Sequence, residues 1–381
     1  MIEITQELKQ QIASKGLGSS LFPAFEQLGI TQAHGYMANM LEGAKAEPCI
    51  NSIHASCIRS LNIALDSLIT ENGLDAWSSA ELRAACEDHP LLVFGGAERS
   101  KKTASQASKI VEIESYGHLK SAFHGRSVTQ VPERGGRGGK TPDFKVGDDI
   151  YVEVYCPDES NPERERVVNE LANQCGNIRL AISRPVTGSA SKAVQFATNQ
   201  TIARVVGAKR ENDQTVPDCK NILWLDVKYK LQLMACSTAP IQSVTHGENA
   251  YIGCFGLWHA FYGKAEESIF PKERYCLKYD GCRDDTYQQK DKEGLFRERP
   301  HMSAAVISCL DGNVLFLNPW CQSPLDQSDI LALLRMYHFR PEFSFFCKGT
   351  LSQEILAQEE RIRLLLDPQR VAQLSADGEG E

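Results

Sequence analysis

The sequence predicts a mixed α/β fold in which helices flank a β-sheet core, and three features of residue order indicate it. The first part of the chain, to about residue 122, carries apolar residues at helical spacing. Between residues 127 and 155, short β-rich runs alternate with turn residues. A second helix-like stretch is then followed by the apolar run NILWLDV. Helix, hairpin, helix and strand in this order are typical of α/β and α+β proteins.

The N-terminal region, residues 1–104, is predicted to be helical. Residues 50–69 carry apolar side chains at a spacing of about 3.6 positions, and residues 79–86 continue the pattern. Another helix is expected over residues 105–122. We interpret the N-terminal region as a helical unit that supports the rest of the chain.

The middle region, residues 105–230, is predicted to hold the core of the fold. Residues 127–131 alternate like a strand and precede the glycine-rich loop ERGGRGGKT. Two β-rich runs, DFKV and IYVEVY, flank Gly147-Asp148-Asp149, and these residues favour a hairpin turn. A short helix is expected near residues 164–174, a longer one over 191–209, and a buried strand at NILWLDV.

The C-terminal region, residues 231–381, is predicted to be an α/β extension, rich in strands, that packs on the core. Its apolar runs at residues 303–310 and 314–317 are separated by Asp311-Gly312-Asn313, which indicates a second hairpin. A terminal helix is expected over residues 351–366.

Composition and charge narrow the classes of function. The net charge of −8 argues against a protein that coats DNA by bulk charge, although a local basic patch can still bind phosphate. No apolar run reaches the roughly 18 residues that a membrane helix needs, and a cytoplasmic protein is expected. The 13 cysteines include no CxxC pair, so reduced structural thiols are expected in place of a zinc site.

Two acidic residues of the predicted hairpin form the most suggestive constellation in the sequence. Alternation along the strand IYVEVY places Tyr151, Glu153 and Tyr155 on one face and its Ile and Val residues on the other. Asp143 lies on the preceding strand, and the turn falls close to midway between the two acids, so they are expected to be cross-strand neighbours. Two carboxylates suit Mg²⁺ or Mn²⁺, and such an ion would polarise a phosphodiester and activate water.

The segment TPDF…IYVEVY resembles the PD-(D/E)XK superfamily of nucleases and nuclease-like domains, with matches at Pro142, Asp143 and Glu153 and at Glu114 on the preceding helix. The resemblance covers roughly residues 105–230. It implies a restriction-endonuclease-like fold and cleavage of nucleic acid that depends on Mg²⁺ or Mn²⁺. It further implies that Asp143 and Glu153 bind metal and that Glu114 is an accessory acid.

The chain departs from the superfamily at Tyr155, where a lysine is usual. A tyrosine, with a pKa near 10, is neutral and supplies no positive charge. In one interpretation the lysine has moved to the following helix, where Lys192 would orient the attacking water and Gln195 shares its face one turn later. Lys140 is a weaker substitute. In the other interpretation the domain is catalytically inactive and binds nucleic acid or a protein partner.

Three further features bear on the site. The loop cations Arg134, Arg137 and Lys140 are either a solvated loop or a phosphate-binding patch for nucleic acid. His118, four residues after Glu114, is either a structural histidine or a site residue. A second literal match to the motif, at Asp218 and at Asp226 with Lys228, is rejected, because CKNILWL between its acids contains no turn residue and would hold them roughly 26 Å apart as one strand.

Overall fold

The computed structural model describes the central sheet and parts of the N-terminal and C-terminal regions. The described residues are 1–33, 35–46, 58–59, 61–62, 65–66, 77, 82, 101–132, 141–157, 205–207, 209, 214–228, 242–244, 250–252, 257, 260–262, 293–309, 312–336 and 339. Within them, no helix combines the length and the apolar character needed to cross a membrane.

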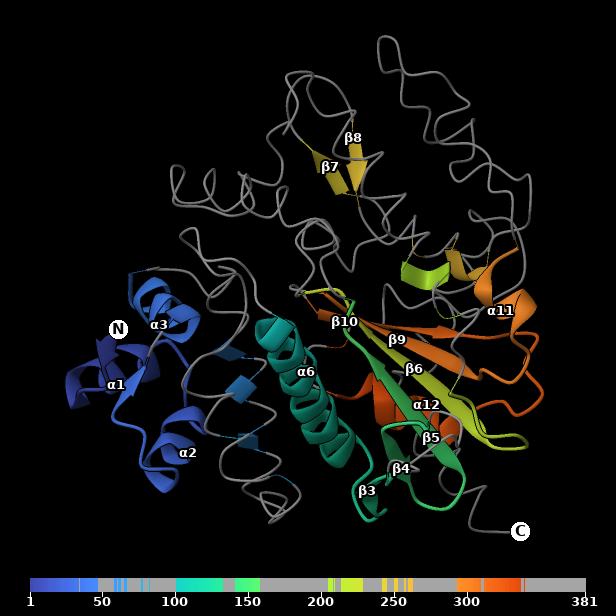
Figure 1. Cartoon of the computed structure of the whole chain (residues 1–381), viewed down its shortest axis with the longest axis horizontal. Coiled ribbons are helices and arrows are strands. Elements are labelled where there is room, and N and C mark those ends of the chain that lie inside the picture. Colours follow the sequence, from blue (N-terminus) through green and yellow to red (C-terminus); the bar gives the residue numbers. More distant parts are fainter. Residues whose placement is uncertain are drawn as a thin grey trace, which may run out of the picture.

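A six-stranded mixed sheet forms the centre of the structure, with strand order β10-β9-β6-β5-β4-β3 (Figure 1). Its strands are β3 (Val128–Gln130), β4 (Phe144–Val146), β5 (Ile150–Tyr155), β6 (Lys220–Asp226), β9 (Ala304–Cys309) and β10 (Gly312–Leu317). The pairs β3–β4, β4–β5 and β9–β10 are antiparallel, whereas β5–β6 and β6–β9 are parallel. The predicted α/β class is confirmed.

The first predicted hairpin is confirmed, and its turn has a specific physical basis. Gly147 adopts a φ of +58°, in the left-handed region that glycine tolerates best. Its amide donates to the Ser127 carbonyl at 2.8 Å, which links the turn to the start of β3. A Cβ atom on Gly147 would lie 2.9 Å from Nε of Arg126, so the guanidinium passes directly over the turn.

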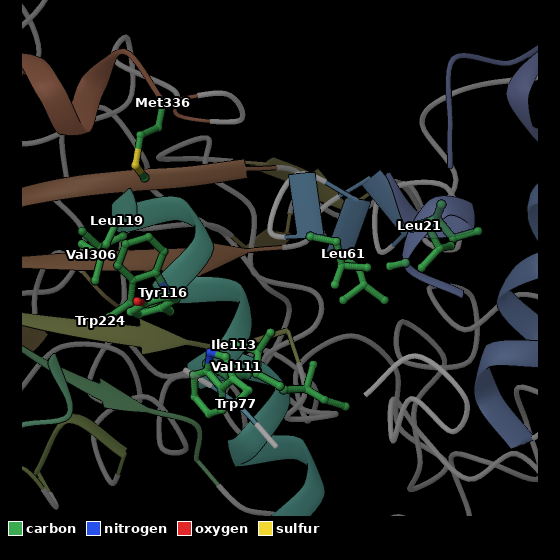
Figure 2. Packing of buried hydrophobic residues seen from close by; sticks show 14 of the residues in the cluster. Leu21, Leu61, Trp77, Val111, Ile113, Tyr116, Leu119, Trp224, Val306 and Met336 are labelled. Carbon is green, nitrogen blue, oxygen red and sulfur yellow. The ribbon is translucent and has the colours of Figure 1, made fainter. Parts of the chain in front are cut away.

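Helix α6 (Lys101–Ala122) covers one face of the sheet and lies between it and the N-terminal helices (Figure 1). Tyr116 and Leu119 of α6 pack beside Trp224 and Val306 of the sheet, as Figure 2 shows. On the opposite face, Leu223 belongs to a second buried cluster. Parallel strands that are covered on both faces bury nearly every side chain. The sequences of β6 and β9 are accordingly nearly continuous apolar runs.

The N-terminal helices α1 (Gln6–Ala13), α2 (Leu21–Gln27) and α3 (Gly35–Ala46) confirm the predicted helical character where the structure describes it. Two short strands, β1 (Ile2–Glu3) and β2 (Gln32–Ala33), pair antiparallel and were not expected. Most of the helix expected over residues 50–69 and all but one residue of the 79–86 stretch lie outside the described residues. One buried cluster joins these helices to α6 and to the sheet.

In the C-terminal region, the predicted hairpin is present as β9 and β10, and it continues the central sheet because β9 pairs with β6. The expected turn position was wrong in part, because Gly312 and Asn313 belong to β10 and pair with Cys309 and Ser308. Two short helices, α11 (Leu295–Glu298) and α12 (Gln327–Leu334), flank it, and β7 (Gln242–Val244) pairs separately with β8 (Ala250–Ile252). The helices expected over residues 164–174 and 351–366 lie outside the described residues. The boundaries of the three predicted regions stay predictions.

Charged side chains hold α12 against the hairpin turn. Asp329 of α12 accepts from Arg126 Nη1 at 2.7 Å, and its other oxygen lies 2.8 Å from Lys220 Nζ. The same two cations contact Asp149, at 2.6 Å from Arg126 Nη2 and 2.8 Å from Lys220 Nζ. These contacts raise the pKa of Lys220 against the opposing effect of burial, and they lower the pKa of Asp149. The amino end of the parallel strands is therefore fixed by a charge network.

Candidate active site

Asp143 and Glu153 lie near each other at the end of the β4–β5 hairpin that is away from its turn, close enough for the charge of Glu153 to act on Asp143. Phe144 of β4 pairs with Val152 of β5, and Asp143 directly precedes β4. The expectation that the two carboxylates are cross-strand neighbours stays a prediction. The Asp143 amide donates to the Val152 carbonyl at 3.0 Å, and Asp143 Oδ2 accepts from the Val154 amide at 2.7 Å. Asp143 is thus bonded to both residues that flank Glu153.

The surroundings of Asp143 favour a positive partner or a bound proton. Burial raises its pKa to about 6, and the negative charges of Glu112 and Glu153 act in the same direction. The Val154 amide and the Lys209 ammonium oppose this rise. Because Glu112 lies on α6, this helix contributes negative charge near Asp143.

Lys209 brings a cation to this acid pair. Its Nζ donates to Glu153 Oε1, and the lysine side chain is 10% exposed. Residues 205–207 and 209 are helical, and Val205 and Val206 are buried in the cluster on the same side of the sheet. Nζ also lies 4.1 Å from the centre of the Tyr155 ring. A lysine from the helical segment therefore reaches the face of β5 on which the sequence carries Tyr155.

The sequence interpretation did not assign Lys209 to the site, although a signal for it exists. Lys209 is the last residue of the helix predicted over 191–209, and it follows Val206 and Val205 by three and four positions. Residues at this spacing share a helix face. An apolar pair in those positions indicates that the lysine stem faces the sheet along with them.

Gln214 contacts Glu153 from the segment that leads into β6. Its amide nitrogen donates to Glu153 Oε1 at 3.1 Å and to the Thr141 carbonyl at 3.2 Å, in the amide orientation that satisfies both neighbours. Beside it lies a small hollow of about 200 Å³, counting its open mouth, which Pro142, Tyr151, Glu153 and Met302 help to line. Glu153 is therefore buried on its strand yet borders a space that opens outward.

Glu114 belongs to a different buried cluster. Its Oε2 lies 2.7 Å from Lys228 Nζ, which also lies 3.1 Å from Asp226 Oδ2. Asp226 follows Trp224 by two positions and shares the α6 face of β6, whereas Glu153 pairs with Leu223 of the other face. Glu114 thus approaches the sheet from the face opposite to Glu153, and its accessory role stays a prediction.

His118 lies in the same cluster as a neutral side chain. Its ring stacks on Trp224 with 5.9 Å between centroids, and burial lowers its pKa to about 4, helped by the charge of Lys228. The second literal match to the motif does not form a site, because Lys220–Asp226 is one continuous strand. Asp218 lies just before the start of this strand and Asp226 lies at its end. The prediction of a core strand is confirmed.

The structure bonds Asp143 to the residues that flank Glu153, and it adds Lys209 and Gln214 as contacts of Glu153. The remaining predicted site residues lie outside the described residues: Arg134, Arg137, Lys140, Lys192 and Gln195.

No family model, curated protein or solved structure matches this chain. The geometry of the site is therefore the basis on which a function is assigned.

The donor set at Asp143 and Glu153 suits one kind of metal better than others. In the described part of the chain, no group of three or more His, Cys, Asp or Glu side chains is arranged to hold an ion. A zinc or calcium site built from protein side chains alone would need more ligands. Mg²⁺ commonly binds one or two carboxylates and completes its shell with water and substrate phosphates. The carboxylates of Asp143 and Glu153 fit that pattern in number and kind.

Proposed function

We propose that this chain is a metal-dependent nuclease with a restriction-endonuclease-like core, which hydrolyses phosphodiester bonds of nucleic acid. Asp143 and Glu153 would bind Mg²⁺ or Mn²⁺, and Lys209 would supply the positive charge that Tyr155 lacks. The observation that carries the proposal is the contact between Lys209 Nζ and Glu153 Oε1 on the Tyr155 face of β5.

The order of elements supports the core assignment. Helix α6 is followed by the antiparallel strands β3, β4 and β5, then by the helical residues 205–207 and 209, and then by β6 parallel to β5. The PD-(D/E)XK resemblance implies the same order of helix, three strands, helix and strand. Two independent features, the motif residues and the topology, thus favour one assignment.

Each residue would have a separate task. A bound Mg²⁺ or Mn²⁺ supplies Lewis-acid polarisation of the phosphodiester and a more acidic water. Asp143 must give up the proton that its raised pKa, about 6, lets it hold at mildly acidic pH. The ammonium of Lys209 would stabilise negative charge that develops on the phosphate or orient the attacking water. Gln214 would keep Glu153 in place through its bond to Oε1.

A catalytically inactive module is the second candidate, and the same contact gives it a specific basis. Lys209 and Glu153 are 8% and 5% exposed, and they form an ion pair that a metal would have to rearrange. A buried pair that stays closed would leave Asp143 without a second carboxylate for the ion. The chain would then use the fold to bind nucleic acid or a protein.

To test the proposal, the purified full chain is incubated with labelled single- and double-stranded DNA and RNA in the presence of Mn²⁺, Mg²⁺ or EDTA, and cleavage is measured. We expect cleavage only with metal. Asp143→Asn and Lys209→Met should each lower the rate by at least about a hundredfold, as removal of one electrostatic contact in an active site does. Lys209→Met should still bind Mn²⁺ in calorimetry, since the lysine is no ligand.

Lys9→Met is the matched control, because it also removes a paired lysine, but one that lies on α1 near the N-terminus and outside the proposed site. It should cleave at the wild-type rate. Binding of labelled nucleic acid with no cleavage in any metal would favour the inactive module. Absence of cleavage in every metal would end the nuclease proposal, and absence of Mn²⁺ binding as well would also remove the metal site.

A further inference from the structure

The ring of Tyr155 is in contact with the lysine of the proposed site. The distance of 4.1 Å from Lys209 Nζ to the ring centroid lies well within the roughly 6 Å over which an ammonium is attracted to an aromatic face. Tyr155 is partly buried, and it packs against the same apolar cluster that contains Val205 and Val206. The ring therefore lies between the apolar cluster and the cation.

The strand geometry explains why the ring and the carboxylate share one cation. Glu153 and Tyr155 are two positions apart on β5, so their side chains project from the same face. The ammonium of Lys209 contacts the carboxylate of the first and the ring of the second. Lysine is a flexible point charge on a long stem, and these contacts limit where its charge lies.

We propose that Tyr155 is a positioning residue for Lys209: its aromatic face holds the ammonium against Glu153, in place of the lysine usual at its own position. This inference rests on the proposed function for its catalytic meaning. The attraction comes from the ring quadrupole and not from the hydroxyl. Phenylalanine should therefore replace Tyr155, whereas an aliphatic side chain of similar bulk should not.

A purely structural role predicts a different pattern. If Tyr155 only fills space in the apolar cluster, leucine should serve almost as well as phenylalanine for packing. The two roles are separated by a readout at Lys209 itself. Methylene protons of a lysine held over a ring are shifted upfield by the ring current, and they lose that shift when the ring is replaced.

The experiment uses full-length protein labelled with ¹³C in the lysine side chains. The Lys209 Cε resonance is assigned by its loss in Lys209→Met. We expect an upfield-shifted Hε signal in wild type and in Tyr155→Phe, and an ordinary signal in Tyr155→Leu. In the cleavage assay, Tyr155→Leu should lower kcat on the order of tenfold with little change in KM, while Tyr155→Phe stays near wild type.

Three outcomes would overturn the proposal. The first is a Lys209 signal without an upfield shift in wild type, a result that needs no variant of Tyr155 to fold. The second is Tyr155→Leu with an unchanged Lys209 signal. The third is Tyr155→Phe as impaired as Tyr155→Leu, which would assign the effect to the hydroxyl. If wild type does not cleave at all, the nuclease proposal fails, while the resonance still decides whether Tyr155 holds Lys209.

Discussion

Lys228 Nζ, just beyond the end of β6, lies 2.7 Å from Glu114 Oε2 on α6, and both side chains are almost completely buried. Asp226, at 3.1 Å from the same ammonium, makes this a cluster of two acids around one base. Burial raises the pKa of Asp226 to about 6, against the lowering effect of Lys228. The contact ties the helix that carries Glu112 to the sheet that carries the proposed site.

Lys228→Met should destabilise the protein strongly. It leaves two carboxyl groups buried without their cation, and breaking a buried pair in this way typically lowers the free energy of unfolding by about 3–5 kcal/mol. Urea denaturation measures the loss. Lys9→Met is the control, because Glu26 of that pair is 67% exposed and exposed pairs contribute about 1 kcal/mol or less. Equal effects of the two substitutions would show that the buried cluster does not stabilise α6 on the sheet.

His118 should make stability depend on pH. Burial lowers its pKa to about 4, with Lys228 acting in the same direction and Glu114 in the opposite one. The unfolded chain takes up this proton near pH 6.5 and the folded chain does not, so stability falls as pH decreases from about 6.5 to 4. The expected loss at pH 4 is about 3 kcal/mol.

Asp143 and Asp226 have the opposite effect on stability over part of this pH range. The test therefore compares the stability of wild type with that of a His118 variant at each pH. The pKa values of Asp143 and Asp226 are raised to about 6, and protonation of the folded state therefore adds stability as pH falls from 6 to 4. Both wild type and His118→Gln contain the two aspartates, so their contributions cancel in the difference between the two free energies of unfolding. This difference, wild type minus variant, should decrease steadily from pH 7 to pH 4. His124→Gln removes an exposed histidine as the control. A flat difference for His118→Gln would contradict the neutral buried state.

Gly147→Ala should cost more stability than Gly125→Ala. Both glycines have positive φ, +58° and +83°, so both substitutions carry backbone strain of about 1 kcal/mol. Only Gly147 adds a collision, because its new Cβ would lie 2.9 Å from Nε and Nη2 of Arg126, whereas nothing lies within 4 Å of a Cβ on Gly125. Arg126 is held by Asp149 and Asp329, so we expect about 1–3 kcal/mol of additional loss. Equal midpoints in urea would show that Arg126 moves aside freely.

Metal binding at the proposed site should weaken below about pH 6. The proton that Asp143 retains because of its raised pKa, about 6, competes with the ion, and displacement of one proton changes the apparent affinity by up to about tenfold per pH unit. Calorimetric titration with Mn²⁺ at pH 5, 6 and 7 measures this dependence. Asp143→Asn should bind weakly and without the inflection near pH 6. An affinity that does not change between pH 5 and 7 would remove Asp143 from the ligand set.

The elements with local sequence signals could be predicted from the sequence. The hairpin at β4 and β5 follows from a glycine turn between two β-rich runs. Counting residues on either side of Gly147 placed Asp143 near Glu153, and the pairing of their carboxylates stays a prediction. The apolar run at β6 and the hairpin at β9 and β10 were predicted in the same way. Side-chain alternation along a strand and the geometry of a tight turn depend only on neighbouring residues.

The tertiary structure decided which distant residues meet. Lys209 reaches Glu153 across 56 positions, and Lys228 reaches Glu114 across 114 positions. The sequence interpretation chose Lys192 for the cationic role, because helical spacing shows that two lysines share a helix but not which one faces the strand. That choice depends on how the helix packs on the sheet, and packing is set by the whole apolar core.

By itself, the sequence determined the class of fold and the two hairpins, because each depends on residues that are close together in the chain. It also nominated Asp143 and Glu153 as the candidate acids. The parallel pairing of β5, β6 and β9, the burial of Glu114 with Lys228, and the contact of Lys209 with Tyr155 arose only in the folded chain. Contacts of this kind bring together segments that no local pattern relates, and they form only when burial of both faces of the sheet brings its helices into place.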